Sequence, residues 1–172
     1  LWADFLGRVA RAEARGSDEP RFESAPFDHP LYIMYSSGTT GVPKCIVHGQ
    51  GGTLLQHMKE LMLHCDLRRE DTILYFTTCG WMMWNWLVSS LGVGATVVLY
   101  EGSPAYPDAD HLWRMADRLG ITVFGTSAKY IAACEKLGLH PGSQHDVSKL
   151  RAVLSTGSPL TVENFRWVYD NV

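Results

Sequence analysis

Strong charge of either sign is missing from this 172-residue chain, in which 15 lysine and arginine residues face 18 aspartate and glutamate residues and the formal net charge is -3. Neither nucleic acid nor an anionic membrane surface is therefore expected as a partner. The four cysteines form no Cys-x-x-Cys pair and lie in apolar runs. That usage is typical of reduced thiols in a cytoplasmic protein, not of a disulfide framework or a zinc site. The pattern of a secretory signal peptide is also missing at the start.

Charge is absent altogether from residues 72–100, a run long enough to span a bilayer. Glycine, asparagine and serine residues interrupt it, however. It also divides into a β-branched and aromatic piece, a tryptophan-rich piece and a second β-branched piece. A strand, a helix and a strand of a parallel sheet covered on both faces give this pattern. We expect no membrane span.

What the chain does contain is a run of hydrogen-bond donors, Tyr35-Ser36-Ser37-Gly38-Thr39-Thr40-Gly41-Val42-Pro43-Lys44. It lies between residues 31–35, which predict a buried strand, and residues 45–48, which predict a second strand. Hydroxyl groups, glycine-exposed backbone N–H groups and one lysine, with no carboxylate, suit the phosphates of a nucleotide. A simple hairpin turn needs far fewer residues. The run therefore favours a phosphate-binding loop over a polar turn.

Two better-known loops do not fit. The spacing Gly38-x-x-Gly41-x-x-Lys44 differs from the Gly-x-x-x-x-Gly-Lys-Ser/Thr pattern of P-loop enzymes. Pro43 also biases the chain toward an extended conformation, so no helix is expected to begin at Lys44. The Gly-x-Ser-x-Gly elbow of serine hydrolases is not met either, because no glycine stands two residues before either serine. We expect the loop to hang between two strands and to close over phosphates.

The rest of the chain predicts an α/β fold. Apolar residues recur with helical spacing over residues 2–14, and a polar, proline-containing linker runs to residue 30. Beyond the loop, strands alternate with helices, which predicts a mostly parallel sheet with helices on both faces. The expected strands are residues 73–77, 96–100, 121–124 and 152–155; the expected helices are residues 81–91, 112–119, 128–137, with Ser127 as N-cap, and 162–172.

One further helix is expected after the turn at residues 49–52, with Thr53 as its N-cap. Its polar face carries His57 and His64, which are expected to be solvated because no further metal ligand stands at helical spacing. Its buried stripe is predicted to be Leu54, Leu55, Met58, Leu61 and Met62.

The segment Tyr35–Lys44 resembles the signature of the acyl-adenylate-forming enzymes, which include acyl-CoA synthetases, luciferases and peptide-synthetase adenylation domains. Residues 43–52, 80–86 and 155–159 extend the resemblance and are most similar to the synthetases that activate acetoacetate. The resemblance implies that residues 31–172 are part of an AMP-binding (adenylation) domain, the large N-terminal domain of such an enzyme. Residues 1–30 are then an N-terminal helix and linker, and the small C-terminal domain lies outside the chain.

The resemblance also implies site residues. In the family the loop binds the β- and γ-phosphates of ATP, and a tryptophan matching Trp81 borders the acyl pocket. Lys129 polarises the 3-oxo group or holds the carboxylate of acetoacetate, or else is a solvated lysine in the first turn of a helix, where a cation opposes the helix dipole. Ser158 stands where acetyl-CoA synthetases have a glutamate. The implied residues are Ser36, Ser37, Gly38, Thr39, Thr40, Gly41 and Lys44 for phosphate, with Thr39, Thr40 and Lys44 catalytic; Trp81, Met82 and Lys129 for the acyl group; and Gly157, Ser158 and Pro159 for adenine.

The implied chemistry joins an acid to coenzyme A through an acyl-adenylate, with Mg²⁺ entering with ATP and no metal site within the chain. ATP, acetoacetate and coenzyme A are the expected partners. Alone, the chain is expected to be inactive and to self-associate through exposed apolar surface. Two alternatives stay open: a synthetase for acetate or another short acid, and a nucleotide-binding module without catalytic activity.

Overall fold

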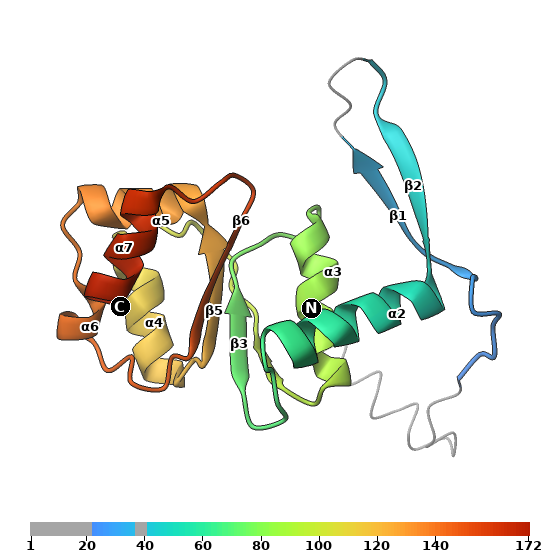
Figure 1. The fold of residues 1–172 in the computed structure, drawn as a ribbon, viewed down its shortest axis with the longest axis horizontal. Helices are drawn as coiled ribbons and strands as arrows, with labels where there is room; N and C mark the ends of the chain where they lie inside the picture. Colours follow the sequence, from blue (N-terminus) through green and yellow to red (C-terminus); the bar gives the residue numbers. More distant parts are fainter. Residues whose placement is uncertain (1–21, 37–40) are drawn as a thin grey trace, which may run out of the picture.

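The computed structural model describes residues 22–36 and 41–172. The helix expected over residues 2–14 and the loop residues Ser37, Gly38, Thr39 and Thr40 lie outside this part of the chain. The described residues form two sheets: a β-hairpin and a four-stranded parallel sheet with the order β4-β3-β5-β6 (Figure 1).

The hairpin consists of β1 (Pro30–Ser36) and β2 (Lys44–Gly49), which pair antiparallel with Ser36 opposite Lys44. The prediction of a loop between two strands is therefore confirmed. The prediction that the first strand is buried is wrong, because Leu31, Ile33 and Tyr35 on one face are 49%, 59% and 70% exposed. Only the opposite face of β1 is half-buried, where the Asn85 side-chain amide donates to Met34 Sδ at 3.2 Å.

The parallel sheet contains β3 (Thr72–Tyr75), β4 (Thr96–Val98), β5 (Val123–Ser127) and β6 (Ala152–Thr156). Consecutive residues of its strands point to opposite faces. Ile73 and Val123 pack into one core, whereas Leu74 and Phe124 pack into the other. Because both faces carry a core, the predicted parallel sheet with helices on both sides is confirmed.

One face of the sheet is covered by α2 (Gln50–Lys59), its π-helical continuation η1 (Glu60–His64), α3 (Met82–Val88) and the 3₁₀ turn η2 (Ser89–Gly92). The other face is covered by α4 (His111–Leu119), α5 (Ala128–Lys136) and α7 (Val162–Asn171), as Figure 1 shows. A short helix, α6 (Pro141–Gln144), was not expected from the sequence. Among the described residues, no helix has the length and apolarity needed to cross a membrane.

Helix α2 differs from its prediction. It begins at Gln50 with Gly49 as its N-cap, so Thr53 does not cap it. His57, expected to be solvated, is buried, and its Nδ1 lies 2.8 Å from Ser89 Oγ. The helix turns this face toward η2, and η1 then changes the helical register. Leu61 is buried as predicted, while Leu54, Leu55 and Met62 of the predicted stripe are exposed.

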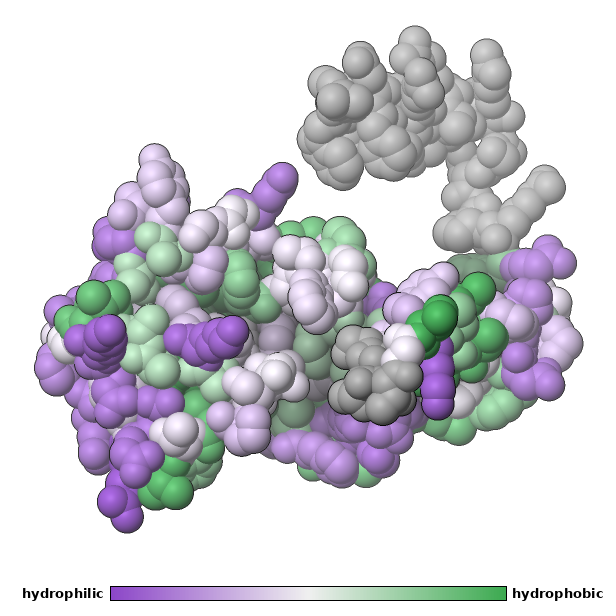
Figure 2. Space-filling model, turned by 90° about the horizontal axis from the view of Figure 1, so that it is seen from above, coloured by the Kyte–Doolittle hydropathy of each residue, from purple (hydrophilic) through white to green (hydrophobic). Residues whose placement is uncertain are grey.

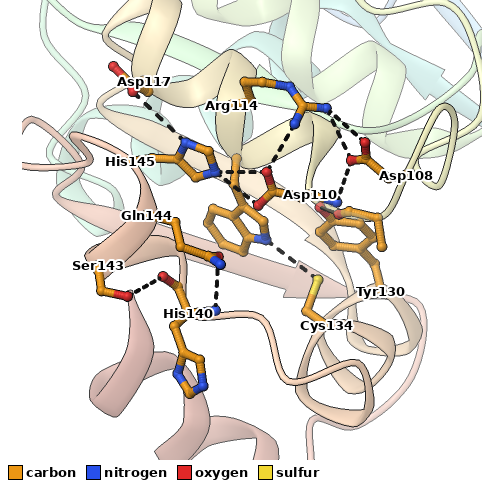
Figure 3. Close-up of polar contacts among 12 residues, drawn as sticks. Asp108, Asp110, Arg114, Asp117, Tyr130, Cys134, His140, Ser143, Gln144 and His145 are labelled. Carbon is orange, nitrogen blue, oxygen red and sulfur yellow. Dashed lines mark hydrogen bonds and ion pairs between the residues drawn. The ribbon is translucent and has the colours of Figure 1, made fainter.

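A polar cluster fastens the connection between α5 and β6 to α4 (Figure 3). His145 Nε2 lies 2.8 Å from Asp110 Oδ2, and the same carboxylate accepts from Arg114 Nη1 at 3.2 Å. The Tyr130 hydroxyl of α5 donates to the backbone oxygen of Ala109 at 2.7 Å. These contacts hold α5 and the segment that precedes β6 against the start of α4.

Candidate functional site

Three strands of the parallel sheet end at one pocket of about 410 Å³. Because the strands are parallel, their carboxyl ends lie at the same edge, where ligands bind in open α/β sheets. Figure 2 looks down on this end of the molecule, where apolar and weakly polar residues fill much of the centre. The lining residues are Tyr75, Phe76, Thr77, Thr78, Trp81, Met83, Thr126, Ser127, Lys129, Thr156, Gly157 and Ser158.

Tyr75, at the end of β3, forms a fixed wall. Its ring lies against Gly125 of β5, where an added Cβ would fall 2.0 Å from the ring, so only glycine allows this approach. The hydroxyl donates to the backbone oxygen of Thr126 at 3.4 Å. Burial raises the pKa of Tyr75 to about 12.

Ser127 turns the chain from β5 directly into α5. Its side chain caps the helix by accepting from the Tyr130 N–H at 3.2 Å, as expected from the sequence. Lys129 consequently lies in the first turn of α5, with its exposed side chain at the pocket. It supplies a positive charge where a carboxylate or phosphate oxygen could bind.

Trp81 lies on the loop after β3, at the N-cap position of α3, and is 70% exposed. Its backbone N–H donates to the backbone oxygen of Thr78 at 3.0 Å, which fixes the loop. Met83 lines the pocket beside it and is partly buried. Met82, predicted from the sequence for the acyl pocket, lines two neighbouring cavities and not this one.

At the end of β6, Gly157 adopts a φ of +94°, a conformation that side chains rarely allow, and turns the chain across the pocket mouth. Gly157 and Ser158 line the pocket, whereas the exposed Pro159 does not. The predicted adenine-binding segment is therefore placed at the pocket by two of its three residues.

The phosphate-loop residues Ser36, Gly41 and Lys44 lie at the far end of the hairpin, and none of them lines the pocket. In Figure 1 this end of the hairpin and the carboxyl ends of the parallel strands lie on the same side of the molecule. Ser37, Gly38, Thr39 and Thr40 lie outside the described residues.

Sequence reasoning missed the threonines of the pocket. Thr126 is 1% exposed and its hydroxyl has no hydrogen-bond partner among the described residues. A buried hydroxyl without a partner is costly unless a ligand or water completes it. The position of these threonines at strand ends was the signal that could have identified them. Within the described ranges, no three histidine, cysteine, aspartate or glutamate side chains are placed to hold a metal ion.

The pocket can hold a small organic acid: aromatic and methionine side chains form an apolar wall, and Lys129 and hydroxyl groups supply donors for oxygen atoms.

Comparisons with known proteins agree with this chemistry. The sequence profile of the AMP-binding enzyme family matches residues 4–172. The acetoacetyl-CoA synthetase of Danio rerio is 57% identical over 168 residues, 96% of this chain and 25% of that protein. The malonamoyl-CoA synthetase vrtB of Penicillium aethiopicum is 48% identical over 92% of this chain and 24% of that protein.

A solved structure, the acetoacetyl-CoA synthetase from Streptomyces lividans, superposes with a TM-score of 0.84 at 55% identity, covering 89% of this chain and 24% of that one. The chain thus spans about a quarter of the length of the relatives it matches.

Proposed function

The chain belongs to the AMP-binding enzyme family, and on that premise we propose that it is part of an ATP-dependent acyl-CoA synthetase that activates acetoacetate. One observation carries the proposal: a single pocket collects Trp81, Lys129, Gly157 and Ser158 from three different strand ends. In an acyl-adenylate the acyl group is joined to adenine through the phosphate and the ribose, so the acyl and adenine sites must lie within the length of one such molecule. A cytoplasmic location belongs to the proposal and rests on the four free cysteines.

The substrate is proposed from the pocket and from the named relatives together. Acetoacetic and malonamic acid both carry a carbonyl oxygen on the third carbon. Lys129, whose exposed side chain lines the pocket, is the donor that suits this oxygen. A site that hydrogen-bonds a substrate group discriminates strongly against analogues without it. The substrate class is accordingly a short 3-oxo acid.

The proposed reaction has two steps. The acid's carboxylate oxygen attacks the α-phosphorus of ATP, and the bond from that phosphorus to the bridging oxygen breaks, so that acyl-AMP forms and pyrophosphate leaves. The thiol sulfur of coenzyme A then attacks the acyl carbon and AMP leaves. Neither step needs a nucleophile from the protein, so positioning and charge neutralisation provide the rate enhancement. Mg²⁺ enters as the ATP complex.

The roles of individual residues follow the same proposal. Lys44 and the donors Ser36, Ser37, Gly38, Thr39, Thr40 and Gly41 hold the departing pyrophosphate. Trp81 bounds the acyl group, and Gly157 to Pro159 lie against adenine. The activity is expected of the full-length protein.

The test is acid-dependent exchange of pyrophosphate into ATP by the full-length protein, with acetoacetate, butyrate and acetate compared. Exchange chiefly with acetoacetate is expected. Lys129→Ala should raise the KM for acetoacetate about tenfold relative to that for ATP, the cost of losing a charged hydrogen bond. Lys136→Ala, at the exposed far end of the same helix, is the control.

Each other result has a definite meaning. Equal KM changes in the two variants would remove Lys129 from the acyl site. Exchange with acetate or butyrate alone would keep the reaction and discard the 3-oxo substrate. A protein that binds ATP but exchanges with no acid would be the nucleotide-binding module.

A further inference from the structure

A second cavity of about 240 Å³ adjoins the pocket. Tyr75, Met83 and Thr156 line both spaces, so these three side chains separate them. On the far side, the walls include the apolar side chains of Met82, Trp86 and Leu154. The partition therefore stands between the proposed acyl site and a second space, which these apolar side chains line together with Glu60, His64, Cys65 and Ser155.

Two members of the partition are fixed by their surroundings. Tyr75 is 5% exposed, lies against Gly125 and meets Trp86 edge-on with ring centroids 6.1 Å apart. Thr156 belongs to β6 and is paired with Ser127 of β5. Met83 is held differently, because it is a flexible side chain on the first turn of α3 and only partly buried. It is the one member that can be shortened without disturbing the sheet.

The chemistry of the second cavity limits what could enter it. Glu60 lines it, and this carboxylate already accepts from Trp86 Nε1 at 3.0 Å and from the Gln56 side-chain amide. Its negative charge opposes a second carboxylate at the distal end of a substrate. The apolar walls instead suit the unbranched alkyl tail of a monocarboxylic acid.

We infer that Met83 determines the chain length of the acid, by closing the inner end of the acyl pocket against this cavity. The inference rests on the proposed function, because it assumes that the pocket holds the acyl group. Removing the Met83 side chain joins the two spaces and admits alkyl chains longer than that of acetoacetate.

The test uses the full-length protein and measures kcat/KM for pyrophosphate exchange with butyrate and with hexanoate. Each methylene group newly covered by apolar walls is worth about fourfold. Hexanoate has two more methylene groups than butyrate, so the hexanoate-to-butyrate ratio should rise about sixteenfold in Met83→Ala. Met82→Ala is the matched control: Met82 lines the second cavity but not the pocket, so its truncation leaves the partition in place and the ratio unchanged.

Several results would overturn the inference: a wild-type ratio near one, an unchanged ratio in a folded Met83→Ala protein, or equal rises in both variants. If thermal melting shows that Met83→Ala is unfolded, Met83→Val keeps an apolar side chain on α3 and must show a smaller rise in the ratio. A wild-type protein that exchanges with no acid would refute the proposed function, and the inference with it. Activity confined to short acids in every folded variant refutes the inference alone.

Discussion

Replacing Gly125 by alanine tests how tightly the wall of the pocket is packed. The new Cβ would fall 2.0 Å from Cδ2 and 2.4 Å from Cε2 of Tyr75. Carbon atoms in contact prefer a separation of about 3.5 Å or more, so the ring must move by about 1.5 Å. It has little room to do so, because Tyr75 is buried and packs against Trp86.

The expected cost follows from two opposing contributions. Overpacking a core costs about 1–3 kcal/mol, and a rigid aromatic ring close to the backbone lies toward the upper end. Alanine also restricts the unfolded chain, which returns about 0.4–1 kcal/mol. The free energy of unfolding should therefore fall by about 2 kcal/mol in Gly125→Ala.

Urea unfolding of the 172-residue chain, followed by tryptophan fluorescence, measures this loss. In a Tyr75→Ala background the clash is gone, so adding Gly125→Ala should be neutral or slightly stabilising. The coupling energy between the two sites should be about 2–3 kcal/mol. Gly52→Ala makes the same chemical change in α2 with nothing within 4 Å, and serves as the control. A loss that persists without the Tyr75 ring, or that Gly52→Ala reproduces, would show that the wall is not tightly packed.

Two further predictions concern α2 and the hairpin. Burial lowers the pKa of His57, so below about pH 6.5 the unfolded chain binds more protons than the folded chain and stability falls with the pH. Urea unfolding at pH 7.5 and 5.5 should show a smaller difference in His57→Gln, and no change in that difference in His64→Gln, which alters an exposed histidine. Lys44→Ala should slow pyrophosphate exchange about 10²-fold in the full-length protein without shifting its melting temperature, because Lys44 is exposed; an unchanged rate contradicts its role.

The elements with local signals were predictable from the sequence. Ser127 caps α5 with its side-chain oxygen, as predicted, and Gly120 ends α4 in a left-handed conformation. Burial was predictable only where both faces of an element are covered, as in β3 and β5. The predictions of burial in the hairpin and in α2 were wrong in part. An apolar run such as residues 31–35 does not show whether another element packs against it.

The residues of the candidate site were likewise predictable only in part. Strand ends and the family resemblance identified Trp81, Lys129, Gly157 and Ser158, which the structure brings to one pocket. The choice between Met82 and Met83 depends on the rotation of α3 about its axis, about 100° per residue. Packing of α3 against β3 sets that rotation, and no local signal in the sequence carries it.

The two ends of the parallel sheet differ in whether their buried polar groups have hydrogen-bond partners. At the amino end, Asp71 is 3% exposed and pairs with Arg151 Nη2 at 2.6 Å, joining the starts of β3 and β6. Burial opposes ionisation there, but this guanidinium and the Arg68 backbone N–H outweigh it and hold the pKa of Asp71 below its usual value.

At the carboxyl end, by contrast, the buried hydroxyls of Thr126 and Ser155 have no partner among the described residues. Closing that end in the same manner would stabilise the sheet and fill the pocket. Within the described strands, these two are the buried side-chain hydroxyls without a partner, and both lie at the end of the sheet where the pocket is. The position of the pocket therefore depends on the carboxyl ends of the strands remaining uncovered, as well as on the side chains that line it.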